Sequence, residues 1–230
     1  MALIQDEERG KDQVRWAGVV LAVLFLFSSL IARGEDMEKI SLPKPQLKGT
    51  VSVEEAIQGR RSVRSYLSKE VSIEDISQLL WACQGITDQS RGLRAAPSAG
   101  ALYPLEIYVA NKDGLFHYIP ERHELKFVFR EDVRNGLAAA SYDQRYVGEA
   151  AIDIIITAVH GRITPRYGDR GIRYTDMEAG HAAENVFLQA VALGLDSVAV
   201  GAFSDDAVAK ILKLPAGTKP LYILPVGYRK

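Results

Sequence analysis

The residues best suited to bind an anion lie together in the run Gly59-Arg60-Arg61-Ser62-Val63-Arg64-Ser65-Tyr66. Each arginine presents a planar fork of N–H donors that matches phosphate oxygens in pairs, and serine adds a short hydroxyl donor. In an extended or turn conformation, neighbouring side chains point to opposite sides, so we expect Arg60, Ser62 and Arg64 to share one side and Arg61 to face the other. This layout is typical of an anion pocket, although an exposed basic loop has the same composition.

A second stretch, from Ala96 to Pro104 (APSAGALYP), is suited to hold a flat or anionic ligand by its main chain. Its two prolines restrict φ, and Gly100 permits close approach of the backbone. The small residues between them leave backbone N–H groups accessible. The stretch precedes a predicted strand, so it is either a ligand-binding turn or a plain structural loop.

Other common chemistries lack their motifs. No P-loop lysine motif, no G-x-G-x-x-G after a strand and no G-x-S-x-G elbow is present. The single cysteine, Cys83, excludes an intrachain disulfide, and no metal site is expected because the histidines lack zinc-ligand spacing: His117, His123, His160 and His181. A net charge of −1 argues against binding nucleic acid. Chemistry is therefore expected from a cofactor held by arginines and backbone amides.

Interspersed helices and strands must position these residues. Ser52 and Ser72, each followed three residues later by an acidic residue, predict two helix starts. Alternating or β-branched runs predict strands, and apolar stripes predict helices. The predicted strands are 105–110, 115–119, 125–129, 152–159, 197–201 and 221–226. The predicted helices are 52–58, 73–84, 132–140, 176–193 and 205–212. This order predicts an α+β or mixed α/β domain.

Residues 1–34 are expected to lie outside this fold. Trp16 to Ala32 is an uncharged run of about 17 residues, at the lower limit for a membrane-spanning helix and longer than a usual signal-peptide core. A cleaved signal peptide and an uncleaved membrane anchor through residues 16–32 both stay open. Either implies a membrane-anchored or exported (periplasmic or extracytoplasmic) protein. Residues 35–50 are interpreted as a tether and 51–230 as the folded domain.

Four motifs in order, RRSVRSY, APSAGALYPLEIYV, EAGHAAENVFLQAVALGLDSVAVGAF and LPVGYR, resemble the FMN-dependent nitroreductase superfamily. Within it the chain looks like the SagB-type dehydrogenase branch, and the resemblance covers roughly residues 50–230. It implies an α+β fold with a central mixed or antiparallel sheet surrounded by helices. It also implies FMN bound at a homodimer interface, with NAD(P)H as a candidate transient electron donor.

The resemblance also implies roles for individual residues. The phosphate would be held by Arg60, Ser62 and Arg229, the ribityl chain would lie beside Arg61, and the pyrimidine edge beside Arg64. The ring would be lined by Pro97, Ser98, Ala99 and Gly100, with Val200 and Gly201 near flavin N5. Nitroreductases commonly carry an asparagine in the loop, where this chain has Ala101.

Arg166-Tyr167 stands where azoline-oxidising members of the branch carry a Lys-Tyr pair thought to remove a proton. Arginine cannot act as a base at neutral pH, so Tyr167 is the candidate proton donor or acceptor, and both residues could instead gate the pocket. The sequence thus predicts an FMN-dependent oxidoreductase that transfers hydride through flavin N5 between a reductant and a small organic or peptide substrate. The alternatives are a membrane-tethered flavin-binding protein without turnover and a peptide azoline dehydrogenase subunit of a maturation complex.

Overall fold

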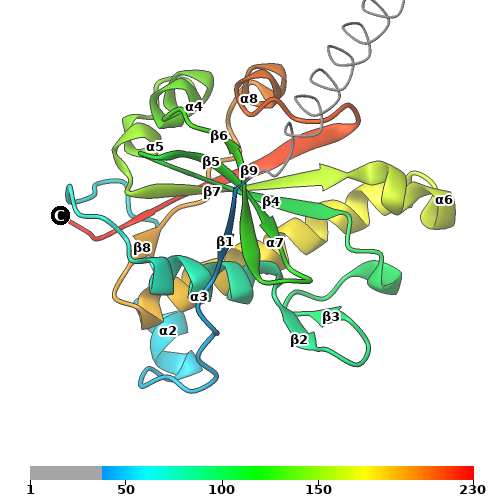
Figure 1. The fold of residues 1–230 in the computed structure, drawn as a ribbon, viewed down its shortest axis with the longest axis horizontal. Coiled ribbons are helices and arrows are strands. Elements are labelled where there is room, and N and C mark those ends of the chain that lie inside the picture. Colours follow the sequence, from blue (N-terminus) through cyan, green and yellow to red (C-terminus); the bar gives the residue numbers. More distant parts are fainter. Residues whose placement is uncertain (1–37) are drawn as a thin grey trace, which may run out of the picture. The chain divides into compact units, whose positions relative to one another are not determined.

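The computed structural model describes residues 38–230 (Figure 1). The expected signal peptide or membrane anchor at 1–34, with its apolar run, lies outside the described residues. Within residues 38–230, no helix combines the length and the apolar character needed to pass through a bilayer.

A seven-stranded antiparallel sheet forms the centre of the described domain, in the spatial order β1-β6-β5-β4-β7-β9-β8 (Figure 1). Its strands are β1 (Lys39–Ser41), β4 (Leu105–Asn111), β5 (Gly114–Ile119), β6 (Glu124–Phe129), β7 (Ile152–Val159), β8 (Asp196–Ser197) and β9 (Thr218–Gly227). A separate two-stranded ribbon pairs β2 (Ile86–Asp88) with β3 (Leu93–Arg94). The expected α+β class with a central antiparallel sheet is confirmed.

Helices cover both faces of this sheet (Figure 1). One face carries α2 (Val53–Gly59), α3 (Ile73–Gln84) and α7 (Arg170–Ala192), and the other carries α4 (Arg134–Ala140), α5 (Arg145–Glu149) and α8 (Asp205–Ile211). Strand β7 shows how the sequence produces these layers. Ile154 and Ile156 pack in the core cluster with α3 and α7, whereas Ile155 packs in the cluster with α4 and α8. Both faces of β7 are buried, which explains its continuous β-branched run.

Serine caps begin α2 and α3 as predicted. Ser52 Oγ accepts a hydrogen bond from Glu55 N at 3.1 Å, and Ser52 N donates to Glu55 Oε2 at 2.7 Å, which completes the capping box. Ser72 Oγ accepts from Asp75 N at 3.1 Å. Helix α3 ends at Gln84, and the next residue is Gly85, where an added Cβ would lie 2.4 Å from the Trp81 ring, so glycine is needed there for close packing.

Helix α7 begins at Arg170 instead of the predicted Asp176. Gly171 lets its first turn approach Ile163 closely, since an added Cβ would lie 3.2 Å from that side chain. The stripe of small residues behaves as expected, because Ala182 and Val186 are buried against the same core as α3.

The predicted strand 197–201 is wrong beyond Ser197. Strand β8 contains only Asp196 and Ser197, and Val200 makes a single bridge to Ile223 of β9. Val198 and Val200 are buried in the cluster beneath α8, so packing rather than strand pairing explains their apolar character.

Part of the expected tether is folded. Residues 39–41 form β1, which pairs with β6, and Leu42 is buried. Pro43 O accepts a hydrogen bond from Ser77 Oγ at 2.6 Å, which ties this segment to α3. Within the described residues, the fold therefore includes β1, which lies ahead of residue 51.

Candidate functional site

The arginine segment, residues 60–66, lies along the edge of the sheet formed by β8 and the C-terminal residues. Ser62 forms a bridge with Ser197 of β8, and Tyr66 forms a bridge with Arg229. Two stretches that are distant in the sequence thus meet at one edge, which we call the arginine edge.

Tyr66 anchors this segment to the sheet. Its side chain is buried against Gly227, where an added Cβ would lie 3.2 Å from the ring. Its hydroxyl lies 2.7 Å from Val63 O and 3.1 Å from Pro225 O, so its proton can be donated to either carbonyl oxygen. Burial, with the nearby carboxylates as a smaller influence, raises the pKa of Tyr66 above its ordinary value, so the hydroxyl remains a neutral donor.

The four arginines at this edge differ in how many donors they leave for a ligand. Arg60 Nε lies 3.8 Å from Glu184 Oε1, a loose pair, and the Arg64 guanidinium lies 5.9 Å from the centre of the Tyr146 ring. Arg61 Nη1 instead donates to the carbonyl oxygens of residues 58 and 60, at 2.9 and 2.6 Å.

Arg229 is held by a partner that the sequence analysis missed. Its Nε and Nη2 donate to the two carboxylate oxygens of Asp196 at 3.1 and 2.5 Å. This fork-to-carboxylate geometry occupies two of its five donors. Arg60 and Arg64 are therefore the arginines most available to an anion.

The loop from Pro97 to Gly100 lies before β4 and continues into the short helix η1 (Ala99–Ala101). Ser98 Oγ accepts a hydrogen bond from Tyr103 N at 2.9 Å, which closes the loop. Gly100, Ala101 and Tyr103 have φ of +64°, +52° and +46°, values that are strained for the two residues with side chains.

Gly100 brings the loop against the two predicted catalytic residues. Arg166 and Tyr167 belong to α6 (Thr164–Tyr167), which follows the short helix η2 (His160–Arg162). A Cβ added at Gly100 would lie 2.8 Å from Arg166 Nη1 and 2.9 Å from Tyr167 Oη. The guanidinium of Arg166 also lies 5.3 Å from the centre of the Tyr167 ring. The loop and α6 thus form one cluster, which we call the loop end.

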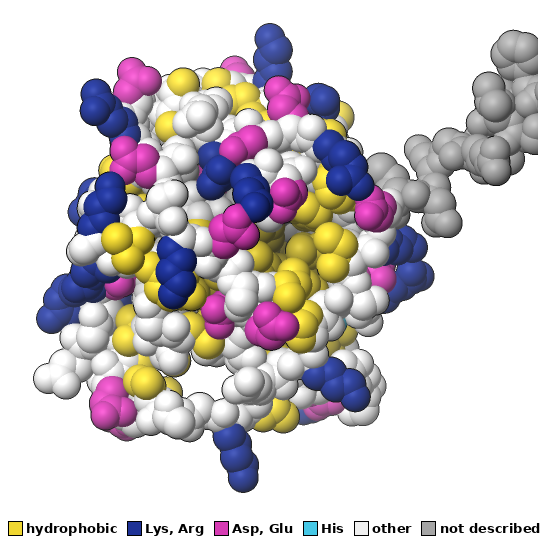
Figure 2. Space-filling view, turned by 60° about the vertical axis from the view of Figure 1, so that its left-hand side comes forward, with side chains coloured by type: hydrophobic (Ala, Val, Ile, Leu, Met, Phe, Trp, Pro, Cys, Tyr) yellow, Lys and Arg dark blue, Asp and Glu magenta, His cyan; other side chains and the backbone are white. Residues whose placement is uncertain are grey.

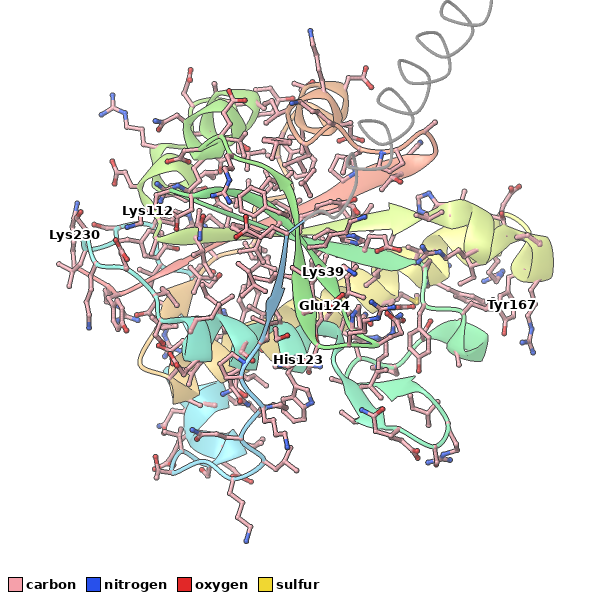
Figure 3. The ribbon with its side chains drawn as sticks, viewed as in Figure 1. Lys39, Lys112, His123, Glu124, Tyr167 and Lys230 are labelled. Carbon is pink, nitrogen blue, oxygen red and sulfur yellow. The ribbon has the colours of Figure 1, made fainter. Side chains whose placement is uncertain are left out.

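The arginine edge and the loop end lie at opposite ends of the sheet. In Figure 3, Tyr167 and Lys230 are at opposite sides of the domain. Strand β7 gives the scale, because its residue Ile152 pairs with Val226 beside β8, whereas Ala158 pairs with Leu105 beside the loop. Six strand residues span roughly 20 Å.

Val200 and Gly201 lie between these two groups. Val200 N donates to Ile223 O at 2.9 Å, and Ile223 pairs with Ile155 in the middle of β7. Gly201 is exposed, and an added Cβ would lie 3.5 Å from the Tyr222 ring.

Sequence reasoning also missed Glu178, a buried carboxyl beside the loop. It belongs to α7 and is 2% exposed, and Gln84 Nε2 of α3 donates to its Oε1 at 3.4 Å. Burial raises the pKa of Glu178 to about 7, against the opposing influences of Ser98, Gln84 and Arg94. A signal was present, because Glu178 lies four residues before Ala182 and so falls on the apolar stripe of α7.

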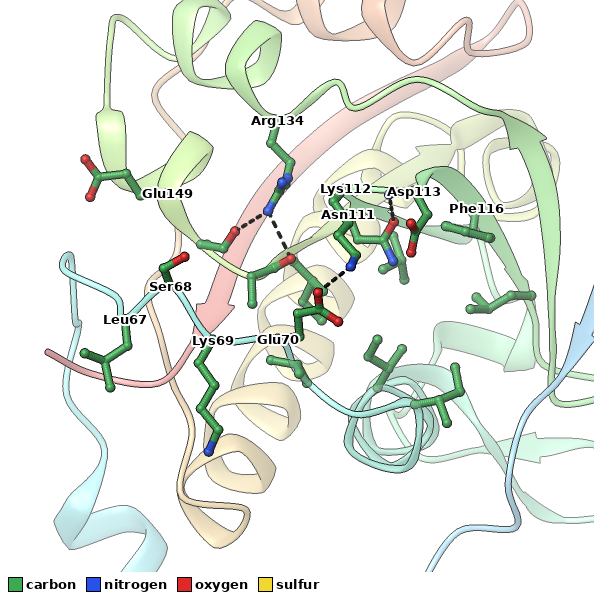
Figure 4. A pocket seen from close by; sticks show the side chains of 18 of the residues that line it. Leu67, Ser68, Lys69, Glu70, Asn111, Lys112, Asp113, Phe116, Arg134 and Glu149 are labelled. Atoms are coloured by element: carbon green, nitrogen blue, oxygen red, sulfur yellow. Dashed lines mark hydrogen bonds and ion pairs between the residues drawn. The ribbon is translucent and has the colours of Figure 1, made fainter.

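A cleft of about 410 Å³ with an apolar floor and a charged rim opens next to the residues that follow the arginine segment (Figure 4). Core side chains form its floor, among them Val109, Phe116 and Ile152, and both signs of charge surround it; Figure 2 shows a face with such a hollow. Lys112 and Glu70 form an ion pair across its rim. None of the residues singled out from the sequence lines this cleft.

A polar cleft, also of about 410 Å³, adjoins the loop end and is lined by Tyr103, Glu106, His117 and Arg162, among others. His117 Nε2 lies 2.6 Å from Glu106 Oε2, and Arg162 pairs with the other oxygen. Burial opposes ionisation of Glu106, but its two partners outweigh burial and lower its pKa. This cleft offers polar contacts beside the predicted catalytic pair.

Comparison with known proteins identifies the family. The model of the nitroreductase family matches residues 57–228. The chain belongs to the nitroreductase family. The nitroreductase-family protein MJ1384 of Methanocaldococcus jannaschii is 44% identical over 200 residues, which cover 84% of this chain and 98% of that protein. The microcin B17-processing protein McbC of Escherichia coli is 26% identical over 160 residues, which cover 65% of this chain and 59% of McbC.

Solved structures show the same fold. A nitroreductase-family protein of Ralstonia eutropha superposes with a TM-score of 0.78 at 27% identity, over 85% of this chain and 92% of its own. The NADPH:FMN oxidoreductase of Vibrio harveyi, solved with NAD+, has a TM-score of 0.59 at 21% identity, over 77% of this chain and 69% of its own. Membership of the family places this nitroreductase-family protein among the oxidoreductases, while the SagB-type branch stays a prediction.

Proposed function

We propose that this protein is an FMN-dependent oxidoreductase that passes hydride between a reductant, such as NAD(P)H, and a small organic or peptide substrate. The observation that carries the proposal is the arginine edge, where Arg60, Ser62 and Arg64 keep donors free in a chain of the nitroreductase family. Bound FMN would supply the hydride-carrying N5 position. The protein would bind the phosphate, line the ring and handle the proton.

The donor set at the arginine edge fits a phosphate monoester. Such a group carries a charge of about −1.5 to −2 at pH 7, which two arginines neutralise. Ser197 Oγ adds a further polar atom, because it is buried beside Ser62 and has no hydrogen-bond partner among residues 38–230. Arg60 and Ser62 would hold the phosphate end, and Arg64 is available either there or at the pyrimidine edge, where the resemblance puts it. Arg229, shared with Asp196, would contribute less than the resemblance implies.

We propose that a second copy of the chain completes the site. The arginine edge and the loop end of one chain are roughly 20 Å apart along β7. A flavin whose phosphate binds at the arginine edge would therefore have its ring lined by the Pro97 loop of a partner chain rather than by the loop of its own chain. Exposed apolar side chains on α2 and α7 support a homodimer, because Val53, Ile57 and Met177 are 64%, 58% and 47% exposed.

At the loop end, Tyr167 is the proposed proton-handling residue. Arg166 carries N–H donors and no acceptor, so it would orient the substrate by donating hydrogen bonds. Their contact with Gly100 places both beside the main chain that would line the ring.

A peptide azoline dehydrogenase is the second candidate, because McbC, named as a microcin-processing protein, is similar over 65% of this chain. The replacement of the expected lysine by Arg166 weighs against it. Oxidation of a thiazoline-containing peptide, with flavin reduction as the readout, distinguishes this candidate from a reductase of quinones or nitroaromatics.

The test begins with the colour of the purified full-length protein. The wild type should bind about one FMN per chain, and Arg60→Ala with Arg64→Ala should weaken FMN binding at least 100-fold, since each charge-assisted contact contributes about 1.5–3 kcal/mol. Arg91→Ala, at an exposed arginine paired with Asp88, is the matched control. A colourless wild type that FMN cannot reconstitute would refute the proposal, and FMN binding without NAD(P)H-driven turnover would favour a flavin carrier.

A further inference from the structure

Glu178 is a buried carboxyl group to which the proposed function gives no role. It lies on the inner stripe of α7 and is 2% exposed. The contact with Gln84 is long, at 3.4 Å, and Glu178 Oε2 has no hydrogen-bond partner in the described part of the chain. Burial of an incompletely satisfied carboxylate disfavours its ionised form.

The surroundings of Glu178 bring the pKa of its carboxyl group close to neutral pH. Burial raises the pKa of Glu178 to about 7, and Ser98, Gln84 and the positive charge of Arg94 limit the rise. Arg94 is the charged group that acts on Glu178 from a neighbouring element, and it is itself paired with Glu121 at 2.8 Å. A change in nearby charge would therefore alter how much of Glu178 is protonated.

Ser98 connects this carboxyl to the loop. Ser98 Oγ accepts from Tyr103 N at 2.9 Å, and the Ser98 hydroxyl is close enough to Glu178 to lower the pKa of that carboxyl. Ala101 and Tyr103 of the same stretch have positive φ, a strained conformation that the surrounding structure must maintain. Glu178 thus lies beside the loop proposed to line the ring.

We propose that Glu178, beside Ser98 of the Pro97–Gly100 loop, takes up one proton when a ring on this loop gains two electrons. The inference rests on the proposed function, because it requires FMN at this loop. The proposed protonation of Glu178 would make the redox potential of the FMN site depend on pH.

The electrons and protons balance with a dihydronicotinamide as donor. The donor loses a hydride and is oxidised, and the added negative charge beside the loop increases the affinity of Glu178 for a proton, on the order of tenfold. Glu178 then binds one proton from solvent. When an acceptor takes the hydride, the charge leaves, and Glu178 returns its proton to the reduced acceptor or to solvent.

The test measures the midpoint potential of bound FMN against pH in the full-length wild type and in Glu178→Gln. Glutamine keeps the shape of the side chain but cannot take up the proton. One proton coupled to two electrons changes the potential by about 30 mV per pH unit. Above about pH 7, and up to the higher pKa that Glu178 would have in the reduced protein, the midpoint potential of the wild type should fall more steeply with pH than that of Glu178→Gln, by about 30 mV per pH unit. Below pH 7 the slopes should agree, because Glu178 is protonated in both redox states.

Infrared difference spectra give a second readout at the carboxyl itself. Reduction of the wild type at pH 8 should produce the C=O band of a protonated carboxyl. The band should be absent in Glu178→Gln and present in Asp176→Asn, which removes an exposed carboxylate from the same helix.

The two hypotheses fail in different ways. Equal slopes in wild type and Glu178→Gln, with FMN bound and turned over in both, overturn the inference and leave the proposed function intact. A wild type that binds no FMN refutes both. If Glu178→Gln does not fold, the presence or absence of the wild-type infrared band, and its shift in Glu178→Asp, decides the question.

Discussion

Replacing Gly100 by alanine tests whether the Pro97 loop and α6 form one site. Gly100 has φ of +64°, a conformation that costs alanine about 1–2 kcal/mol. The new methyl group would also lie 2.8 Å from Arg166 Nη1 and 2.9 Å from Tyr167 Oη, which is closer than real Cβ contacts. Both contacts involve the far ends of flexible side chains, so these ends should move away rather than destabilise the fold.

Gly92→Ala is the matched control for backbone strain. Gly92 has φ of +65°, and an added Cβ would have no atom within 4 Å. Both variants should therefore lose about 1–2 kcal/mol of unfolding free energy, which lowers Tm by about 2–8 °C in a chain of this size. Thermal unfolding followed by circular dichroism measures this common loss.

Only Gly100→Ala should impair turnover. Displacing a catalytic group by about 1 Å can cost on the order of 100-fold in rate, so we expect kcat/KM for NAD(P)H-dependent reduction to fall about 10- to 100-fold. FMN affinity should change little, because the phosphate would be held at the arginine edge. Equal kcat/KM values in Gly100→Ala and Gly92→Ala would refute the placement of Arg166 and Tyr167 in the site.

Three further changes test the energetics of the fold. Because the folded pKa of Glu178 is raised from 4.5 to about 7, the folded protein binds this proton more tightly, so stability should be lost as pH rises from 4.5 to 7. Denaturant unfolding should show a loss of about 2–3 kcal/mol over this range in the wild type that is absent in Glu178→Gln. Tyr66→Phe removes the hydroxyl that donates at the arginine edge, so it should cost about 1–2 kcal/mol and weaken FMN binding, both measurable by titration; an unchanged Tm would contradict the anchoring role. Asp153 is fully buried, and burial, partly offset by Arg134, raises its pKa well above the ordinary value. Asp153→Asn should therefore raise Tm more at pH 9 than at pH 5, and a uniform or reversed shift would contradict this reasoning.

Elements with strong local signals could be predicted from the sequence. Helix α3 has the predicted bounds because Ser72 caps its start and an apolar stripe follows. Strand β7 also matches, since a β-branched run with both faces buried is recognisable without its neighbours. In contrast, β1 exists only through its pairing with β6, and nothing in residues 39–41 alone predicts that contact.

The candidate site could be predicted in its residues but not in its pairings. Local spacing suggested that Arg60, Ser62 and Arg64 act together, whereas the ion pair of Arg229 with Asp196 joins residues 33 positions apart through the fold. Such a pair depends on the register of β8 against β9 and leaves no local pattern. The burial of Glu178 had a pattern, because the helical period places it on the apolar stripe of α7.

Helix α7 carries acidic residues that face both the arginine edge and the loop end of one chain, which belong to two different sites in the proposed homodimer. Glu184 faces Arg60 of the arginine edge, and Glu178 faces Ser98 of the loop. These two positions are six residues apart (184 − 178), or about 9 Å along the helix axis. The buried alanines around them allow α7 to pack closely against the core, so its position relative to the sheet is well determined. In the proposed homodimer, α7 of each chain would therefore position an arginine of one site through the exposed Glu184 and the loop of the other site through the buried Glu178.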